Sequence, residues 1–329
     1  YNTEQQSQRF VRLDEVRAHL PPDLQGEARE IFVKSVEGAW RAYAELSSRL
    51  EPVVLELLSE LWRLRKRQSK AFGRSVAKEA EKKAIETARY VIPIACHTAM
   101  VYTVSGLTLH RLRRMAAACD ASREARTLVN RMVAEVERID PAFFREIGDD
   151  PLESADVQEF SLAPARLGDP AALEAFDKSL DGRRARLVDY GLRGPEVIAD
   201  AVRQVIGQSD LDDESALDCV LDPARNRRRL EPLDVSAHSP LMRTLHHANY
   251  TFKKKLSHSA DSQDQRHRMV PASRPLLTRT VPGFVDVVEP ELIASDPACR
   301  GLFRESVEAA WEARGRLLDL GAPPELALY

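Results

Sequence analysis

The feature that most constrains the fold is an internal repeat near the two ends of the chain. Residues 31–40 read IFVKSVEGAW, and residues 302–311 read LFRESVEAAW. Six of the ten positions are identical at a single offset of 271 residues. A repeat of this kind indicates two structurally related units in one chain. We therefore interpret the chain as a tandem of two repeats.

The spacing of apolar residues predicts that both repeated segments are helical. In the first copy, apolar side chains recur at helical intervals from Phe32 to Leu46, and Pro52 is expected to open a second helix. Tyr90 follows Trp40 by 50 residues, whereas Tyr329 follows Trp311 by 18. The difference predicts an insertion of about 32 residues in the first repeat. We expect residues 49–80 to form a helical hairpin, with four apolar side chains buried against a partner: Leu57, Leu58, Leu61 and Trp62.

A second segment carries groups suited to anion recognition. Residues 263–268 read QDQRHR and follow a strand-like stretch at residues 248–257, where Tyr250, Phe252 and Leu256 alternate loosely with polar residues. Arginine offers a planar fork of five donors that suits phosphate or an anionic ring edge, and the intervening histidine can donate to a ring nitrogen or oxygen. A bare Arg-His-Arg triplet would also fit a solvated basic loop, so its surroundings have to decide between the two.

Those surroundings resemble the flavin-dependent thymidylate synthases of the ThyX type, whose signature is amide-x-x-Arg-His-Arg. The family's upstream Thr-Leu-Glu-His-x-x-Phe-Thr-Phe stretch is matched by TLHHANYTF at residues 244–252, with His246 in place of Glu. The family's Ser-x-Arg-Tyr segment is missing after Arg268. A similar segment, YNTEQQSQRF, occupies residues 1–10. We therefore expect the chain to be a piece of a longer tandem protein.

The resemblance assigns candidate site residues by position. Catalytic roles fall on Ser7 and Arg266. The residues expected to bind the nucleotide are Glu4, Ser7, Arg9, Arg89, Arg114, Gln263 and Arg266, with Arg113 as an alternative register for Arg114. The residues expected to bind flavin or folate are Thr244, Arg266, His267 and Arg268. Arg89 is assigned because ETARYVIP at residues 86–93 is similar to the family's Ala-Arg-x-Val-Leu-Pro segment.

The two repeats depart from the family in different places. The first has Ser105 and Leu107 where the family has the Asn and Arg of an Asn-x-Arg-x-Leu element that holds the flavin. The second lacks the Ser-x-Arg segment, and Leu328 stands where the first repeat has Arg89. Because the losses are complementary, we expect composite sites formed between repeats, within one chain or across a dimer.

The resemblance implies reductive methylation of dUMP to dTMP, with methylenetetrahydrofolate as carbon donor, FAD as hydride source and NADPH as flavin reductant. It also implies an oligomer, because family members are homotetramers with sites between subunits. Two alternatives stay open. One is a non-catalytic homologue that binds nucleotide or flavin weakly or serves as a scaffold, and the other is methylation of a different nucleotide.

Composition excludes several other classes of protein. The net charge of −3 does not favour general nucleic-acid binding, and no apolar run is long enough to span a membrane. The four cysteines lie far apart and form no CxxC pair, so we expect no metal site and a cytoplasmic protein with reduced thiols. The expected fold is α+β: two repeats of mixed helices and antiparallel sheet, residues 1–178 being helix-rich and residues 179–329 forming the second repeat.

Overall fold

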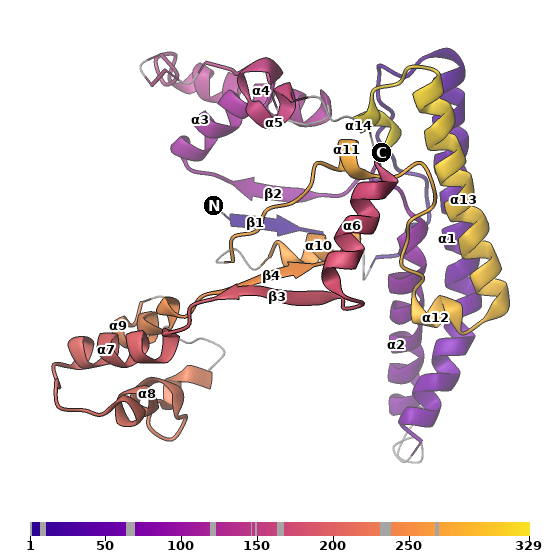
Figure 1. The fold of residues 1–329 in the computed structure, drawn as a ribbon. Helices are drawn as coiled ribbons and strands as arrows, with labels where there is room; N and C mark the ends of the chain where they lie inside the picture. The colour runs from indigo at the N-terminus through magenta and orange to yellow at the C-terminus, as the bar shows by residue number, and fades with distance from the viewer. Residues whose placement is uncertain are drawn as a thin grey trace. The chain divides into compact units, whose positions relative to one another are not determined.

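The computed structural model describes residues 2–6, 11–63, 70–118, 123–145, 147–148, 150–162, 168–230, 238–266 and 270–329. The chain divides into two compact units (Figure 1): Tyr1–Pro170 together with His267–Tyr329, and Ala171–Arg266. Each unit combines helices with a two-stranded antiparallel sheet, β1–β2 in the first and β3–β4 in the second. The α+β class expected from the sequence is confirmed.

The first unit contains thirteen named elements among its described residues. They are β1 (Asn2–Gln5), α1 (Gly26–Leu61), α2 (Lys70–Ala88), η1 (Arg89–Val91), β2 (Met100–Thr103), α3 (Gly106–Met115), α4 (Arg123–Ile139), η2 (Ser154–Asp156), α5 (Gln158–Ser161), α11 (Leu277–Thr280), α12 (Glu291–Ala294), α13 (Pro297–Asp319) and α14 (Pro324–Ala327).

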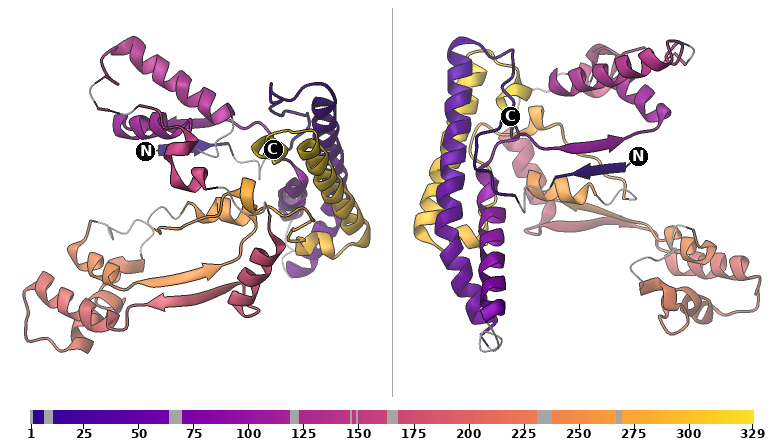
Figure 2. Two further views of the ribbon diagram at one scale, coloured as in Figure 1. Left: turned by 45° about the horizontal axis from the view of Figure 1, so that its top comes forward. Right: turned by 180° about the vertical axis from the view of Figure 1, so that it is seen from behind.

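The core of the first unit lies between the long helices α1, α2 and α13, which run side by side (Figures 1 and 2). Near the start of α1, Phe32 packs in one apolar cluster with Leu317 from the end of α13. Further along α1, Leu46 shares a second cluster with Phe303 from the start of α13. The two helices that carry the repeated segment are therefore antiparallel neighbours.

The two repeats begin their long helices at equivalent positions. Helix α1 begins at Gly26, and α13 begins at Pro297, 271 residues later. Each helix also holds the loop that precedes it. The hydroxyl oxygen of Tyr43 accepts a 3.2 Å hydrogen bond from the backbone N–H of Leu13. At the equivalent position, Arg314 donates to the carbonyl oxygen of Pro282 at 2.9 Å. The predicted helices and their relative offset are confirmed.

The repeats differ before these helices. The gapless offset of 271 residues in the sequence predicts that residues 1–48 and 272–317 follow the same path. Residues 2–5 form strand β1, whereas residues 273–276 have no regular secondary structure. Proline explains the difference, because Pro275 occupies the position equivalent to Glu4 and cannot donate to a strand ladder. The expectation of a shared backbone path is wrong for this segment.

The inserted helical hairpin is present, but part of its apolar face is exposed within this chain. Within residues 49–80, α1 runs to Leu61 and α2 begins at Lys70. Leu57 is 50% exposed and Leu61 is 74% exposed, so this chain does not bury them, and their burial against a partner stays a prediction. Leu58 and Trp62 are half-buried.

The exposure of the hairpin tip follows from the length of its neighbour. Leu50 is fully buried in the cluster that contains Cys299, near the start of α13. Helix α1 continues for eleven residues beyond Leu50, past the point where α13 can cover it. Pro52 also lies inside this continuous helix rather than at a helix start, so the predicted break is wrong. Proline removes one backbone donor there, and the buried residues on either side of it keep the helix in place.

The second unit is a β-ribbon with helices at both ends (Figure 1). Its elements are α6 (Pro170–Leu180), β3 (Ala185–Tyr190), α7 (Gly194–Ile206), α8 (Asp213–Leu221), η3 (Arg227–Leu230), α9 (Pro240–Arg243), η4 (Thr244–His247), β4 (Tyr250–Lys254) and α10 (His258–Asp264). The strands pair from Ala185 with Lys254 to Tyr190 with Tyr250. Helices α7 and α8 enclose a small core around Val202 and Val220. No helix in the described ranges is long and apolar enough to cross a membrane.

Candidate functional site

The glutamine and first arginine of the QDQRHR segment lie at the end of α10. Ser257 caps the start of this helix by accepting a 3.2 Å hydrogen bond from the N–H of Ala260. Gln263 lies in the last turn, and the N–H of Arg266 donates to the carbonyl oxygen of Gln263 at 3.1 Å. Both side chains are exposed. Residues three apart project from the same side of a helical turn, so the two can reach one ligand. His267 and Arg268 lie outside the described residues.

Three consecutive lysines, the last two residues of β4 and the residue that follows it, hold this region together. The ammonium of Lys254 lies 2.7 Å from Oδ2 of Asp264, which ties β4 to α10. Lys255 contacts the carboxylate of Asp177 on α6 at 2.7 Å. Lys253 donates to the hydroxyl of Ser179 at 2.7 Å. These lysines therefore position the ribbon, although in sequence they would read as a basic patch.

A surface hollow of about 430 Å³ lies at the opposite end of the ribbon, between α7 and the α9–η4 turn. It is lined by Ala201, Gln204, Val205, Pro240, Arg243, Thr244, His246 and His247. Thr244, a predicted cofactor contact, is 3% exposed, and its hydroxyl donates to the carbonyl oxygen of Leu241 at 2.7 Å. That bond uses the hydroxyl proton and leaves acceptor capacity on the oxygen.

The lining of this hollow can stabilise negative charge. Arg243 is always cationic, and His246 and His247 can each donate from an imidazole nitrogen. None of the eight lining residues is a carboxylate. His246 stands where the resemblance places a glutamate, so the change removes a negative charge from the hollow. The donor set fits an anionic group such as a pyrophosphate or a reduced flavin ring.

In the first unit, the chain leads from strand β1 toward the predicted nucleotide contacts. Glu4 pairs with Val101 across the β1–β2 ribbon, and its side chain is exposed. The N–H of Gln6 extends the ladder by donating to the carbonyl oxygen of Ala99 at 2.9 Å. Ser7 and Arg9 follow directly and lie outside the described residues.

Arg89 occupies the junction between α2 and the 3₁₀ turn η1. Its Nε donates to the carbonyl oxygen of Glu86 at 3.1 Å, and its guanidinium lies 5.4 Å from the ring centre of Tyr90. The bond to Glu86 uses one of the five N–H donors of the guanidinium. The Arg89 side chain is half-buried, and the bond to Glu86 fixes its direction. Its remaining N–H donors can still bind an anion.

The two candidate arginines on α3 both make structural contacts. Arg114 donates from a terminal nitrogen to the carbonyl oxygen of Gly148 at 3.1 Å. The guanidinium of Arg113 lies 5.0 Å from the ring centre of Phe144. His110 is 5% exposed and stacks on Phe143 with ring centres 4.8 Å apart. The side chains of Arg113 and Arg114 therefore help to hold α3 in place through contacts within the first unit.

The positions that would hold a flavin in the first repeat do not fit one. Ser105 caps α3, where its Oγ accepts from the N–H of Thr108 at 3.3 Å and lies 3.1 Å from the hydroxyl of Thr108. Leu107 is apolar and 59% exposed. Neither replaces the amide and guanidinium of the family element. At these two positions the first repeat therefore lacks the donors that would hold a flavin, whereas the hollow of the second unit is lined by Arg243, His246 and His247.

The structure groups some predicted residues and separates others. Gln263 and Arg266 share one turn, and Thr244 lies in the cationic hollow of the same unit. Glu4, Arg89 and Arg114 lie on three different elements of the first unit. In the described ranges, no three His, Cys, Asp or Glu side chains gather in a way that could hold a metal ion.

Of the polar residues that line the hollow, only Thr244 was predicted from sequence as a contact; the others are Gln204, Arg243, His246 and His247. Arg243 directly precedes Thr244, so its position next to a predicted contact could have suggested it. Gln204 lies on α7, forty residues earlier in the chain than Thr244, and its side-chain amide donates to Oδ2 of Asp200 at 2.9 Å. Only the packing of α7 against the η4 turn brings it to the hollow, and sequence spacing carries no signal for that.

Comparison with known proteins places the chain in a family. The profile of the thymidylate synthase complementing protein family matches residues 1–142 and 186–329, so the chain belongs to that family. The match in two separate stretches agrees with the two-repeat interpretation.

One curated relative is a flavin-dependent thymidylate synthase from Clostridium tetani (strain Massachusetts / E88). It is 37% identical over 146 residues, which cover 44% of this chain and 52% of the relative. The chain thus spans about half the length of the curated relative that it matches.

Proposed function

We propose that this chain is part of a tandem flavin-dependent thymidylate synthase that converts dUMP to dTMP. Methylenetetrahydrofolate would donate the carbon, and NADPH would reduce the FAD. Residues 1–178 and 179–329 would form the two repeats. One observation carries the proposal: the retained donor groups are divided between the repeats, with Arg89 in the first and Gln263, Arg266 and the cationic hollow in the second.

The second repeat would supply the cofactor side of each site. Arg243, His246 and His247 line a hollow with no carboxylate, which favours an anionic group. Gln263 and Arg266 project from one turn and can contact nucleotide and flavin together. When bound, FAD would supply the hydride. The residues themselves would orient the ligands and stabilise the negative charge that develops during reaction.

The first repeat would supply the phosphate side. Arg89 is directed by its bond to Glu86 and keeps further donors for a phosphate dianion. Ser7 and Arg9, which follow β1, would add a hydroxyl and a second guanidinium. In a composite site, the phosphate-binding groups of one repeat would face the cofactor-binding groups of the other, within one chain or across a dimer. Two such chains would provide four repeats, the number in the homotetramer implied by the family resemblance. A cytoplasmic location would suit this role.

The proposal is tested first by the visible absorbance spectrum of the purified full-length protein. Flavin absorbance that persists after dialysis against buffer is the expected result, with turnover of dUMP when methylenetetrahydrofolate and NADPH are added. Absence of both bound flavin and turnover, after incubation with FAD, would instead support a non-catalytic homologue.

A matched pair of variants locates the cofactor side. Arg266→Ala is expected to weaken FAD or dUMP binding by at least tenfold, because a charge-assisted contact is lost. Arg225→Ala removes the same charge from the surface of the same unit, where Arg225 lies 3.9 Å from Asp218, and should leave both affinities unchanged. Equal effects of the two substitutions would contradict a specific role for Arg266.

A further inference from the structure

Four large apolar side chains share one face of the β3–β4 ribbon. The strands pair Leu187 with Phe252 and Tyr190 with Tyr250, and alternate residues of β4 point to the same side. A register shift after Leu187 places one extra residue in β3, which keeps Tyr190 on the side of Leu187. We call this surface the apolar ribbon face, and its members are Leu187, Tyr190, Tyr250 and Phe252.

The opposite face of the ribbon makes the contacts with helix α6. The ammonium of Lys253 lies 4.9 Å from the ring centre of Phe176 and donates to the hydroxyl of Ser179 at 2.7 Å. Arg186, its partner on β3, donates to the carbonyl oxygen of Ser179 at 2.9 Å. An antiparallel sheet commonly packs its apolar face and leaves its polar face to water. Here α6 packs on the polar face instead, so it leaves the apolar ribbon face uncovered.

The apolar ribbon face is exposed along its whole length. The exposed fractions are 41% for Leu187, 50% for Tyr190, 58% for Phe252 and 64% for Tyr250. Leu192 and Leu256, each two residues beyond the end of a strand, are also exposed. A two-stranded ribbon is marginally stable by itself and gains stability when an apolar face is packed. A continuous apolar strip of this kind marks an interaction surface.

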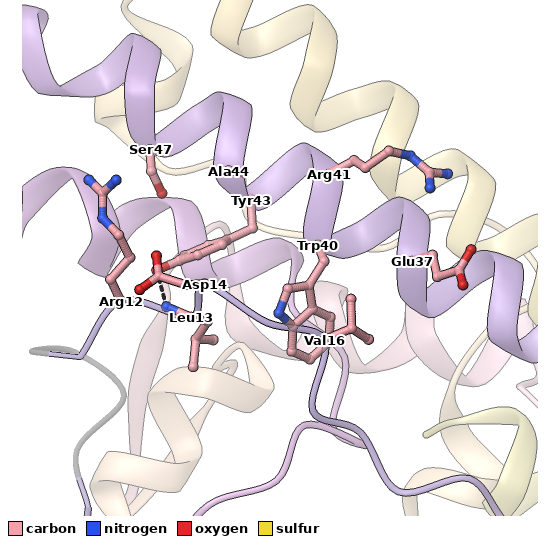
Figure 3. Close-up of a pocket in the computed structure, with 10 residues that line it drawn as sticks. All are labelled: Arg12, Leu13, Asp14, Val16, Glu37, Trp40, Arg41, Tyr43, Ala44 and Ser47. Atoms are coloured by element: carbon pink, nitrogen blue, oxygen red, sulfur yellow. Dashed lines mark hydrogen bonds between the residues drawn. The ribbon is translucent and has the colours of Figure 1, made fainter.

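The two main hollows among the described residues include no side chain of the apolar ribbon face. The hollow of about 430 Å³ is formed by α7 and the α9–η4 turn. A pocket of about 420 Å³ lies in the first unit, between α1 and residues 12–16 (Figure 3). Sites for small molecules are concave and enclose most of their ligand. The apolar ribbon face therefore suits a protein surface better than a small molecule.

The chemistry of the face favours a second copy of the same ribbon as its partner. None of its four members is charged, and Lys254 at its base is already paired with Asp264. A strongly charged partner would find no opposite charge there, whereas an identical face is complementary about a two-fold axis. The other ribbon of the chain is less suited, because β1 reads NTEQ and contains no apolar residue.

The exposed area is sufficient for a specific contact between two copies. A buried aromatic side chain removes about 150–250 Å² from water, so a half-exposed one leaves roughly 100 Å² for a partner. The four members of the face, with Leu192 and Leu256, therefore offer about 600 Å² per copy. Two copies would bury about 1,200 Å² together, which is the lower limit of a stable interface.

We propose that two copies of this chain associate through their apolar ribbon faces, with the β3–β4 ribbons packed against each other about a two-fold axis. The proposed function allows composite sites within one chain or across a dimer, and this contact supplies the dimer. The contact does not depend on flavin or dUMP, so it is tested without either ligand.

The first experiment measures the mass of the full chain by sedimentation velocity over a range of micromolar concentrations. The expected species is a dimer, with twice the 37.0 kDa of the chain. Tyr250→Lys buries an unpaired charge in the contact and should weaken association by at least about tenfold. Thr251→Lys is the matched control, because it adds the same charge to the next residue of β4, on the opposite face and across from Asp189. This control should leave the dimer intact.

A photo-cross-linking side chain keeps the test decisive if Tyr250→Lys fails to fold. Benzoylphenylalanine in place of Phe252 preserves an aromatic group on the apolar ribbon face. Irradiation should give covalent dimers in which position 252 is joined to residues 185–192 or 250–256 of the other copy. The same group in place of Thr251 should give no such product.

The proposal is overturned if the unmodified chain stays a monomer over the whole range, or if the two lysine variants dissociate equally. It is also overturned if Tyr250→Lys leaves the dimer intact, or if position 252 cross-links only within its own chain, which would assign the cover to another segment. These outcomes are separate from the proposed function. An active monomer would overturn this contact alone, and a dimer without flavin or turnover would support the contact while contradicting the proposed function.

Discussion

The ammonium of Lys254 contacts Oδ2 of Asp264 at 2.7 Å, and this ion pair joins strand β4 to the last turn of α10. Asp264 directly follows Gln263, so the contact sets the direction of the turn that presents Gln263 and Arg266. The side chains of Lys254 and Asp264 are 36% and 29% exposed, so solvent screens their attraction. The ion pair therefore orients the α10 turn but adds little to the free energy of unfolding.

Asp264→Asn is therefore expected to weaken nucleotide or flavin binding several-fold while changing the free energy of unfolding by less than about 1 kcal/mol. Asp177→Asn breaks the comparable 2.7 Å pair with Lys255 on the same ribbon and provides the control. Binding titrations and thermal melts of both variants separate the two effects. Equal losses of affinity would show that the ribbon as a whole, rather than the α10 turn, matters.

Arg89→Ala should weaken dUMP binding by about 1.5–3 kcal/mol, the value of a charge-assisted hydrogen bond. Arg74→Ala removes the same charge from an exposed position of the same helix α2 and should have no effect. Calorimetric titration of dUMP in the presence of FAD measures both. Wild-type affinity in the Arg89→Ala variant would remove this residue from the phosphate site.

Asp296 caps α13 by accepting a 2.7 Å hydrogen bond from the N–H of Cys299. This bond lowers the pKa of the Asp296 carboxyl below its ordinary value of 3.8. A lowered folded pKa contributes stability above the unfolded pKa, and the contribution is lost as the pH falls through the folded pKa. Asp296→Ala should therefore lower the Tm by a few degrees at pH 7, and the difference from wild type should shrink below about pH 4.

Asp319→Ala is the control for this comparison, because Asp319 is the last residue of the same helix. A carboxylate there opposes the helix dipole, so removing it should not lower the Tm. A loss of stability in the Asp296→Ala variant that did not change between pH 7 and pH 3 would contradict the role of the charged cap.

Cys299 should be the slowest of the described cysteines to react with iodoacetamide at pH 8. Burial raises the pKa of its thiol to about 11, with a further contribution from the hydrogen bond to Asp296. The thiolate is the reactive form, so little of it is present at pH 8. Cys96 and Cys219 are half-buried and serve as internal references. Peptide mapping by mass spectrometry measures the three rates, and comparable rates would show that α13 opens readily.

The sign of the Cys299 effect on stability is opposite to that of Asp296. The pKa of the Cys299 thiol is raised from 9.0 to about 11 in the folded protein. Its contribution to the free energy of unfolding is therefore present below pH 9 and is lost as the pH rises through about 11.

Leu50→Ala should destabilise the protein by about 2–5 kcal/mol, because Leu50 is fully buried among α1, α2 and α13. Leu61→Lys, on the same helix, should change the free energy of unfolding by less than about 0.5 kcal/mol, because Leu61 is 74% exposed. Urea unfolding curves test both. A large loss for Leu61→Lys would indicate that the hairpin tip is covered by another molecule in solution.

The sequence repeat predicted the presence of the two helices more reliably than it predicted their length and the burial of their side chains. Apolar spacing predicted helices at both repeated segments, and α1 and α13 begin at positions related by the offset of 271, because apolar spacing is a local property of the sequence. It could not show that Leu61 would extend beyond the end of a neighbouring helix, since burial depends on the length of the partner. Pro52 likewise suggested a helix start, whereas packing on both sides kept α1 continuous.

The candidate site was predictable only where its chemistry is local. Gln263 and Arg266 were assigned from the resemblance of QDQRHR to a family motif, and the structure places both at the end of α10. Ser105 and Leu107 were identified by the same resemblance as departures from the element that holds the flavin. Arg243 and Gln204 became visible only through the packing of α7 against η4. The ion pairs of Lys254 with Asp264 and of Lys255 with Asp177 likewise became visible only in the folded chain.

The antiparallel contact between α1 and α13 joins equivalent elements of two repeats within a single chain. A contact of this kind between separate subunits would dissociate on dilution, but here the connecting chain keeps the effective concentration of the partner high at any protein concentration. The two sides can also change independently. In a homo-oligomer one substitution alters every copy, whereas here Tyr43 and Arg314 hold their loops with a hydroxyl in one repeat and a guanidinium in the other.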